Sequence, residues 1–223
     1  YHWLLTKPLS KIIKHLTNIN PDRPSEHKLP MLKGNEKNEL GLWINTANQL
    51  LASIERNTHL RREAENSLLR MAQYDFLTGL PNRQQLQQQL DQILEDAGRL
   101  QRRVAVLCVG LDDFKGINEQ FSYQSGDQLL LALSDRLRSH SGRLGALARL
   151  GGDQFALVQA DIEQPYEAAE LAQSVLDDLE QPFLLDQHEV RLRATIGITL
   201  FPEDGDSTEK LLQKAEQTMT LAK

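Results

Sequence analysis

The sequence has little sulfur chemistry and no long apolar run. Among 223 residues there is one cysteine, Cys108, so no intramolecular disulfide can form, and the chain fits a reducing compartment. Cys108 lies inside the apolar run VAVLCV, which predicts a buried structural thiol rather than a reactive one. No apolar run approaches the roughly 18–20 residues needed to cross a membrane. No pattern of a secretory signal peptide is present either.

Basic charge is scarce where a nucleic-acid-binding domain would need it. Residues 75–223 carry 14 Lys and Arg against 24 Asp and Glu, whereas residues 1–74 carry 11 against 7. Nucleic-acid binding depends on neutralising phosphates, so the acidic second part argues against non-specific binding of that kind. The surplus of carboxylates suits a domain that surrounds a cation, although a solvated acidic surface is the common explanation of such charge.

The beginning of the chain predicts a membrane helix upstream of it. The chain starts at Tyr1 rather than at methionine, and we expect it to be a fragment of a longer protein. Its first residues, YHWLL, are followed by Lys7, Lys11 and Lys14. Aromatic residues followed by lysines are typical of the cytoplasmic end of a membrane-spanning helix. The start of a plain amphipathic helix is the alternative.

Two apolar repeats are separated by a polar segment, residues 20–38. Their spacings alternate between 4 and 3 residues, as in the seam of a coiled coil, at Leu5, Leu9, Ile12, Leu16 and Ile19 and again at Leu40, Ile44, Ala47, Leu51 and Ile54. The segment between them is rich in Pro, Asn and charge and predicts an extended connector. Since two short helices cannot bury their apolar stripes alone, we expect a homodimer packed as a four-helix bundle. Packing of both stripes onto the second part of the chain is the alternative.

Residues 75–223 alternate between predicted helices and strands. The strands are predicted at 104–111, 146–150, 155–160 and 190–201, and the helices at 82–100, 126–139, 166–179 and 208–222. The dipeptide Gly151-Gly152 joins the second and third strands as a β-hairpin. The order and the lengths predict an α/β domain in which helices cover a mixed sheet.

Four stretches of this part resemble the GGDEF family, whose active members condense two GTP molecules into cyclic di-GMP. They are YDFLTGLPNR (74–83), GLDDFKGINEQFSYQSGD (110–127), RLGGDQFAL (149–157), and TIGITLFPEDG through AEQTMTLAK (195–223). The first part resembles a HAMP domain, because Pro8 opens its first helix and the stretch NELG (38–41) opens its second. The resemblance implies an all-α HAMP coiled coil over 1–57, a signalling stalk helix over 58–74, for which a solvated linker helix is the alternative, and a GGDEF domain over 75–223.

The implied reaction is a phosphoryl transfer, in which divalent ions neutralise developing charge. In the family the ligands are the first Asp of a DxDxFK motif, a neighbouring carbonyl and the acids of the hairpin turn. In this chain that Asp is Gly110 and the second acid of the turn is Gln154, while Asp153 remains. Asp112 is an alternative ligand, but positions two apart on a strand lie roughly 6.5 Å apart and Mg²⁺ tolerates little error in distance. Capping of the next helix is the other role open to Asp112 and Asp113.

The positions that hold the nucleotide in the family are better kept. The resemblance places guanine recognition at Asn118 and Asp127, for which turn and cap roles are the alternative. It places Phe114 and Lys115 where the first backbone N–H groups of a helix would meet phosphates. Lys115 and Lys223 would add positive charge.

Two further family features bear on regulation. The product-inhibition motif RxxD falls on Gly142 and Gly145, so that site is expected to be absent. Asp75 and Arg83, in the first of the four stretches, are expected to join the stalk to the domain, with simple surface pairing as the alternative.

The sequence therefore predicts a GTP-binding GGDEF domain without cyclase activity, with Mg²⁺ present only together with GTP. We expect it at the cytoplasmic face of the bacterial inner membrane, where it would control a downstream EAL phosphodiesterase domain, as in hybrid membrane phosphodiesterases of the BifA type. One alternative is an active diguanylate cyclase that uses Asp153, Asp112 and backbone oxygens. The other is a dimerising structural relay that binds no nucleotide.

Overall fold

The computed structural model describes residues 10, 13, 28–31, 39–185 and 188–223. The chain divides into two compact units, Tyr1–Leu69 and Arg70–Lys223. The first apolar repeat, at 5–19, and Pro8 lie outside the described residues, so the first helix stays a prediction. In the part of the chain that is described, no helix has the length and the apolar character that a membrane span requires.

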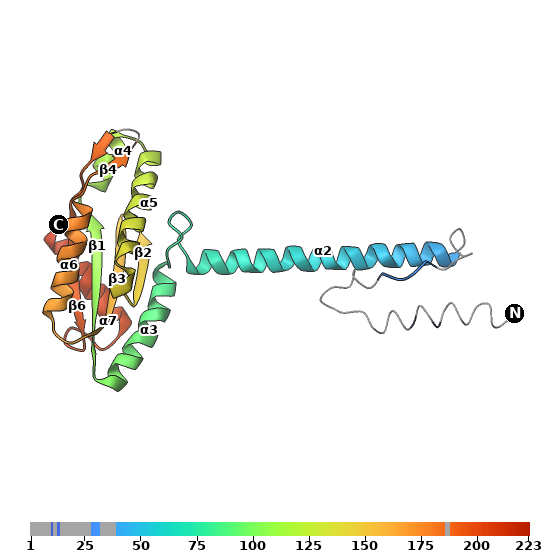
Figure 1. The fold of residues 1–223 in the computed structure, drawn as a ribbon, viewed down its shortest axis with the longest axis horizontal. Coiled ribbons are helices and arrows are strands. Elements are labelled where there is room, and N and C mark those ends of the chain that lie inside the picture. Colours follow the sequence, from blue (N-terminus) through green and yellow to red (C-terminus); the bar gives the residue numbers. More distant parts are fainter. Residues whose placement is uncertain (1–9, 11–12, 14–27, 32–38, 186–187) are drawn as a thin grey trace. The chain divides into compact units, whose positions relative to one another are not determined.

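The second apolar repeat forms part of helix α2, Glu39–Gln73, which continues without a break through the predicted stalk (Figure 1). The described part of the connector, residues 28–31, packs on this helix, because Leu29 is 2% exposed and lies in one apolar cluster with the fully buried Ile44. The side-chain amide of Asn48 fixes the contact, since it accepts from the N–H of Leu29 at 2.7 Å and donates to its carbonyl at 3.0 Å. Further along, α2 leaves large apolar side chains exposed, at Leu50, Ile54, Leu60 and Leu68.

The second unit is built on a four-stranded sheet of order β2-β3-β1-β6 (Figure 1). Its strands are β1 (Arg103–Leu111), β2 (Ala146–Gly151), β3 (Gln154–Ile162) and β6 (Ala194–Phe201). All three pairings are antiparallel, in contrast to the mixed sheet expected from the alternation of helices and strands. The reason is that β3 lies between β1 and β2, so these two strands run in the same direction without pairing with each other.

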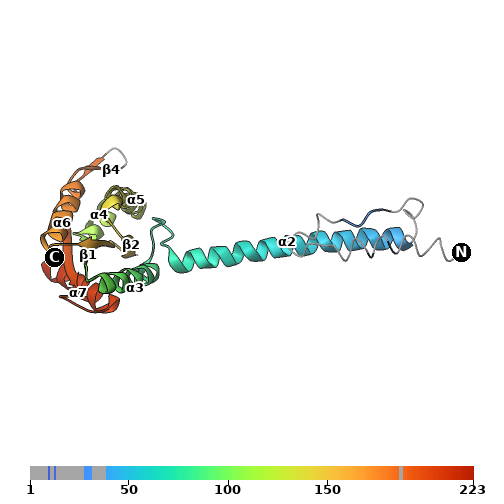
Figure 2. The same cartoon turned by 60° about the horizontal axis from the view of Figure 1, so that its bottom comes forward.

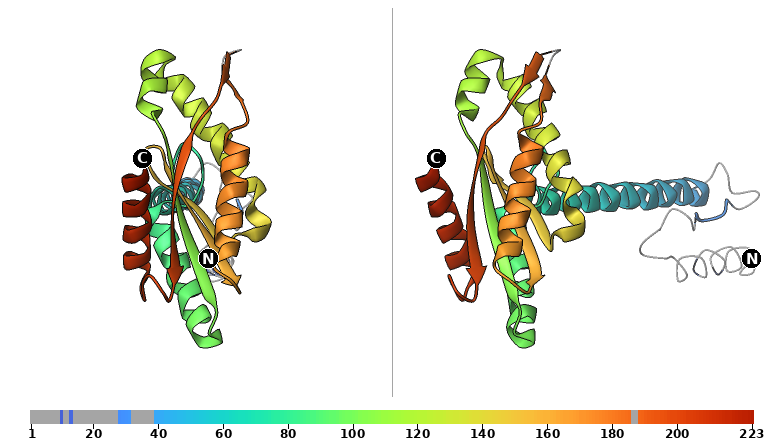
Figure 3. Two further views of the ribbon diagram at one scale, coloured as in Figure 1. Left: turned by 90° about the vertical axis from the view of Figure 1, so that its left-hand side faces the viewer. Right: turned by 60° about the vertical axis from the view of Figure 1, so that its left-hand side comes forward.

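Helices cover both faces of this sheet, as Figures 2 and 3 show. Helices α3 (Arg83–Leu100) and α7 (Thr208–Ala222) cover one face, and α5 (Tyr123–Ser139) and α6 (Tyr166–Leu179) cover the other. Strand β1 is apolar along its length and is buried on both sides, because alternate residues such as Leu107 and Cys108 point to opposite faces. The α/β fold with a preceding long helix is confirmed.

The ends of several elements differ from the sequence-based prediction. Helix α5 begins at Tyr123 rather than at 126, because the hydroxyl of Ser122 caps it by accepting from the N–H of Ser125. A short helix, α4 (Phe114–Gln120), precedes it. The predicted strand at 190–201 is divided: its first residue ends β5 (His188–Val190), which pairs with β4 (Phe183–Leu185) in a separate hairpin.

Candidate functional site

The end of the central strand and the hairpin turn lie side by side. Gly110 of β1 pairs with Gln154 of β3, and the N–H of Leu111 donates to the carbonyl of Asp153 at 3.3 Å. The turn itself depends on glycine, because Gly152 has a φ of +54°, which residues with a side chain rarely adopt. Asp153 is therefore held beside the carboxyl end of β1.

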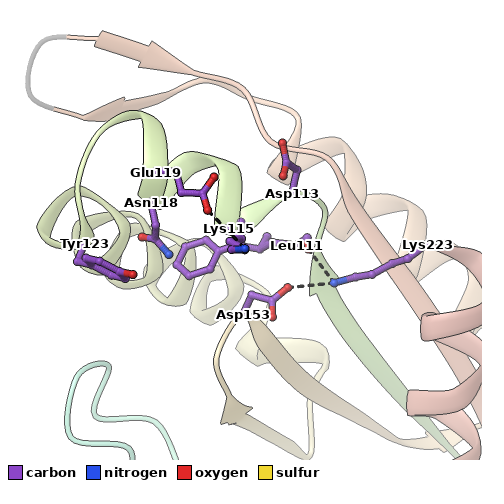
Figure 4. Close-up of a pocket in the computed structure, with 9 residues that line it drawn as sticks. Leu111, Asp113, Lys115, Asn118, Glu119, Tyr123, Asp153 and Lys223 are labelled. Carbon is purple, nitrogen blue, oxygen red and sulfur yellow. Dashed lines mark hydrogen bonds and ion pairs between the residues drawn. The ribbon is translucent and has the colours of Figure 1, made fainter.

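Lys223, at the end of α7, reaches across to this point (Figure 4). Its Nζ donates to the carbonyl of Leu111 at 2.7 Å and pairs with Oδ2 of Asp153 at 3.0 Å. The lysine side chain is 29% exposed and the aspartate side chain 26%. The approach of α7 depends on Gly197 of β6, where a Cβ would lie 2.1 Å from the carbonyl oxygen of Ala215.

The space above Gly110 is filled by side chains of α7 and of the residue that follows it. A Cβ at this position would lie 2.7 Å from Sδ of Met219 and 2.8 Å from both Cε and Nζ of Lys223. Real Cβ atoms do not approach other atoms this closely, so a side chain at position 110 and this placement of Lys223 exclude each other. Lys223 and Met219 thus occupy the space that a side chain at position 110 would need.

A cavity of about 340 Å³ opens over Lys223 and Asp153 (Figure 4). Its wall comes from the end of β1, from α4, from the start of α5, from the hairpin turn and from Lys223. This volume is at the small end of the range for ligand pockets, and most of the lining residues have a polar or charged side chain. The lining residues are Leu111, Asp113, Phe114, Lys115, Asn118, Glu119, Tyr123, Asp153 and Lys223.

Helix α4 carries most of the polar groups of the wall. Asp113 has a φ of +53° and caps the helix, its Oδ1 accepting from the N–H of Gly116 at 3.3 Å, which confirms the capping role for this residue. Asn118 lies directly over the first turn of α5, since a Cβ at Gly126 would be 1.9 Å from its Oδ1. Only glycine at position 126 leaves room for the amide.

Lys115 is the second cation of the pocket. Its side chain is 89% exposed and lies 3.4 Å from Oε1 of Glu119, one turn further along α4. An exposed pair of this kind contributes little to stability, so the ammonium is available to an anionic ligand at small cost.

Four predicted site residues are not part of the cavity wall, one of them Gly110, which Met219 and Lys223 cover. Asp127 is exposed in the first turns of α5, and Gln154 opens β3 without lining the cavity. Asp112 is turned toward β6, where its Oδ1 accepts from Oγ1 of Thr195 at 3.0 Å. Conversely, the sequence analysis missed Tyr123, whose ring is 82% exposed and lies on the Asn118 side of the pocket (Figure 4). Its only signal was a single aromatic residue within the polar stretch SYQSGD.

The residues at the pocket floor do not fit a magnesium site built on two carboxylates. Asp153 is the carboxylate at the floor, and it is already paired with Lys223. Asp112 is hydrogen-bonded to Thr195, and Gly110 has no side chain to offer. Among residues 39–185 and 188–223, no group of three or more His, Cys, Asp and Glu side chains lies close enough to hold a metal ion.

A second ion pair ties the hairpin turn to the loop between α2 and α3. Nη1 of Arg149 lies 2.9 Å from Oδ1 of Asp75, and both side chains are at most 15% exposed. The same guanidinium donates to the carbonyl of Gly152 through Nη2 at 2.7 Å and through Nε at 3.1 Å. Burial alone would raise the pKa of Asp75, but hydrogen bonds from Thr78 and the ion pair with Arg149 together lower it below its ordinary value.

Asp75 and Arg83 thus each form an ion pair near the start of the second unit, but they do not pair with each other. Asp75 is bound to the hairpin, whereas Nη2 of Arg83 lies 2.5 Å from Oε1 of Glu216 on α7.

Comparison with known proteins places this site in a family. Residues 72–223 match the profile described as "Diguanylate cyclase, GGDEF domain". The chain is 39% identical over 160 residues to the bifunctional diguanylate cyclase/cyclic di-GMP phosphodiesterase MucR of Pseudomonas aeruginosa, covering 72% of this chain and 23% of that protein. It is 33% identical over 218 residues to diguanylate cyclase TpbB of the same species, covering 97% of this chain and 49% of that protein. The chain thus spans about half or less of the length of these relatives.

Solved structures agree with this assignment. A sensory box/GGDEF family protein from Caulobacter crescentus superimposes with a TM-score of 0.63 at 37% identity, covering 67% of this chain and 97% of that one. The isolated GGDEF domain of TpbB from Pseudomonas aeruginosa gives a TM-score of 0.63 at 35% identity, covering 67% of this chain and 87% of that one.

Proposed function

Because the chain belongs to the GGDEF family of cyclic di-GMP signalling domains, we propose that its second unit binds GTP in the pocket between α4 and Lys223 without condensing it. The observation that carries the proposal is the placement of the Lys223 ammonium over Gly110 and against Asp153. Condensation of GTP is a phosphoryl transfer that relies on divalent ions to neutralise charge. The floor of this pocket lacks the acids for such an ion.

The chain's own residues support binding of a guanine nucleotide. Asn118 presents an amide to the pocket, and an amide offers both donors and an acceptor to a ring edge. Asp127 lies further along the chain, in the first turns of α5, at the family's other guanine position. A carboxylate there would accept hydrogen bonds from N1–H and from the exocyclic amine of guanine. Lys115 and Lys223 line the same cavity and would pair with the phosphates.

The first unit serves, in this proposal, as a HAMP domain over 1–57 with a stalk over 58–74, which joins two copies into a dimer. The packing of Leu29 on Ile44 supports a connector that lies along its helix. The exposed apolar residues of α2, among them Leu50 and Ile54, support pairing with a second copy. A membrane helix upstream would place the module at the cytoplasmic face of the inner membrane.

Control of a downstream EAL phosphodiesterase domain completes the proposal. The relative MucR is described as bifunctional, with cyclase and phosphodiesterase activities, and this chain spans only 23% of it. Bound GTP would then act as an allosteric ligand, whose effect is limited by its differential affinity for two states of the dimer.

Calorimetric titration of the chain with GTP and with ATP tests the binding proposal. We expect GTP to bind more tightly than ATP, and Asn118→Ala and Asp127→Ala each to weaken GTP binding about tenfold, the worth of a charge-assisted or buried hydrogen bond. Asp135→Ala is the matched control, because Asp135 lies on α5 and pairs only with the exposed Arg138. No heat of GTP binding would favour the structural relay instead. Equal binding of both nucleotides would contradict the roles proposed for Asn118 and Asp127 in recognising guanine.

A further inference from the structure

One aromatic side chain of the pocket has no role in the function proposed above. Tyr123 is the first residue of α5 and its ring is 82% exposed, yet it lines the cavity on the side of Asn118 (Figure 4). The backbone at this point is held by a helix cap, since Oγ of Ser122 accepts from the N–H of Ser125 at 3.1 Å. The ring therefore stands at the edge of the pocket on a helix start that is fixed, with most of its surface open to a ligand.

Groups that can hydrogen-bond to the edge of a base lie close to this ring. Asp127 follows Tyr123 by four residues on α5, and residues four apart lie on the same face of a helix. Asn118 comes from α4 and lies over the same part of α5, because a Cβ at Gly126 would be 1.9 Å from its Oδ1. An amide and a carboxylate bind the edge of a purine in its own plane, whereas an aromatic ring suits its face.

The ion pair of the pocket floor lies away from the aromatic ring. Figure 4 shows Tyr123 and Lys223 on opposite sides of the pocket. A purine nucleotide has the same division, because its flat base is uncharged and its phosphates are anionic. The side of Tyr123 and Asn118 is therefore the place for the base.

We infer that the ring of Tyr123 stacks on the face of the purine base and supplies affinity without selecting guanine. The inference rests on the GTP binding proposed above and deepens it by dividing recognition of the base between two kinds of contact. Stacking accepts any base, because every base has a π-face, whereas hydrogen bonds to the edge distinguish one base from another. A tyrosine also loses little conformational entropy on binding, since only two side-chain torsions become fixed.

Calorimetric titration with GTP and with ITP separates the two contacts, because the base of ITP differs from guanine only in lacking the exocyclic amine. We expect Tyr123→Ala to weaken binding of both nucleotides about fivefold or more and by the same factor, so that the ratio of the two Kd values is unchanged. Asp127→Ala should instead bring the two Kd values closer together, since its carboxylate would accept from the amine. Tyr123→Phe keeps the ring and should bind both nucleotides like the wild type.

Tyr166→Ala is the matched control. Tyr166 is also the first residue of a helix, α6, and its ring is 61% exposed, but it does not line this pocket. The variant should bind both nucleotides like the wild type. Urea denaturation should give Tyr123→Ala the same free energy of unfolding as the wild type, because an exposed ring buries little apolar area. A loss of stability that accounts for the loss of affinity would assign the ring a structural role and overturn the inference.

The outcomes separate this inference from the proposal on which it rests. Binding of GTP that is the same in the wild type and in Tyr123→Ala would overturn the inference and leave the proposed GTP binding intact. A changed ratio of the GTP and ITP Kd values in Tyr123→Ala, or an equal loss of affinity in Tyr123→Phe, would overturn it as well, because the hydroxyl rather than the ring would then contact the nucleotide. Absence of GTP binding by the wild type would contradict the proposed function, and the inference would fall with it.

Discussion

Lys223 occupies the space above Gly110 at the floor of the pocket, since a Cβ on residue 110 would lie 2.8 Å from the lysine Nζ. The lysine also pairs with Asp153 of the hairpin turn at 3.0 Å. The floor of the pocket therefore carries one positive and one negative side chain, beside a position that has no side chain.

An acid at position 110 should displace Lys223 at little cost in stability. In Gly110→Asp the new Cβ would meet the far ends of the Met219 and Lys223 side chains, which can turn away because both are flexible. Urea denaturation should show a free energy of unfolding lower by no more than about 1 kcal/mol, the low end of the cost of overpacking. The control is Gly142→Ala, where a Cβ meets no atom within 4 Å and stability should hardly change. A much larger loss in Gly110→Asp would show that Met219 and Lys223 are held rigidly.

Removing the guanidinium that binds the hairpin to the α2–α3 loop should destabilise the second unit. Arg149→Ala leaves the largely buried Asp75 carboxylate without its partner and the carbonyl of Gly152 without its donors, and we expect a loss of about 2–3 kcal/mol by urea denaturation. Arg149→Lys should restore only part of the lost stability, because an ammonium cannot bind the Asp75 carboxylate and the Gly152 carbonyl together as the planar guanidinium does.

An exposed pair provides the comparison for that variant. Arg99 and Asp96 lie three residues apart on α3 and are 70% and 47% exposed, so Arg99→Ala should change the free energy of unfolding by less than about 1 kcal/mol. A loss as large as that of Arg149→Ala would show that the effect is not specific to the hairpin contact.

Asp75 should make stability depend on pH in the acid range. Its pKa in the folded chain lies below the ordinary 3.8, so its carboxylate stabilises the fold fully above 3.8. That stabilisation is lost as the pH falls through the lower folded pKa. The difference in free energy of unfolding between the wild type and Asp75→Asn should therefore be constant from neutral pH to about 4 and shrink below it. A difference that grows on acidification would contradict the assigned direction.

The single thiol should be inert in the folded chain. Burial raises the pKa of Cys108 to about 12, so almost no thiolate is present at neutral pH. A disulfide reagent such as Ellman's should react with one thiol per chain in denaturant and with none, on the same timescale, in native buffer. Rapid reaction of the native chain would show that β1 opens readily.

The order of elements was predictable because burial leaves a clear periodic pattern. The apolar run of β1 and the apolar stripes of α6 and α7 gave those elements nearly residue by residue. The boundaries set by side-chain caps were less visible: the start of α5 depends on Ser122, which precedes the first apolar residue of its stripe by several positions. The β4–β5 hairpin was missed because its three-residue strands are too short to show alternation.

The site could be predicted only in part. The resemblance to the family predicted that Gly110 and Gln154 stand where active members have acids, and the hairpin prediction placed Asp153 next to a strand end. It could not show that Lys223 fills the vacated space, because that contact depends on how closely α7 packs on β6 at Gly197. Nor could it show that Asp112 faces Thr195, since a slight change of side-chain direction at a strand end decides its partner.

The measurement that tests the account most directly is incubation of the purified chain with GTP and Mg²⁺, and then with Mn²⁺, at high protein concentration to favour dimers. The nucleotides are resolved by chromatography over time. The account predicts that GTP remains unchanged in both metals. Cyclic di-GMP that accumulates in proportion to the amount of chain would contradict it and would show that Gly110 and Lys223 are compatible with catalysis.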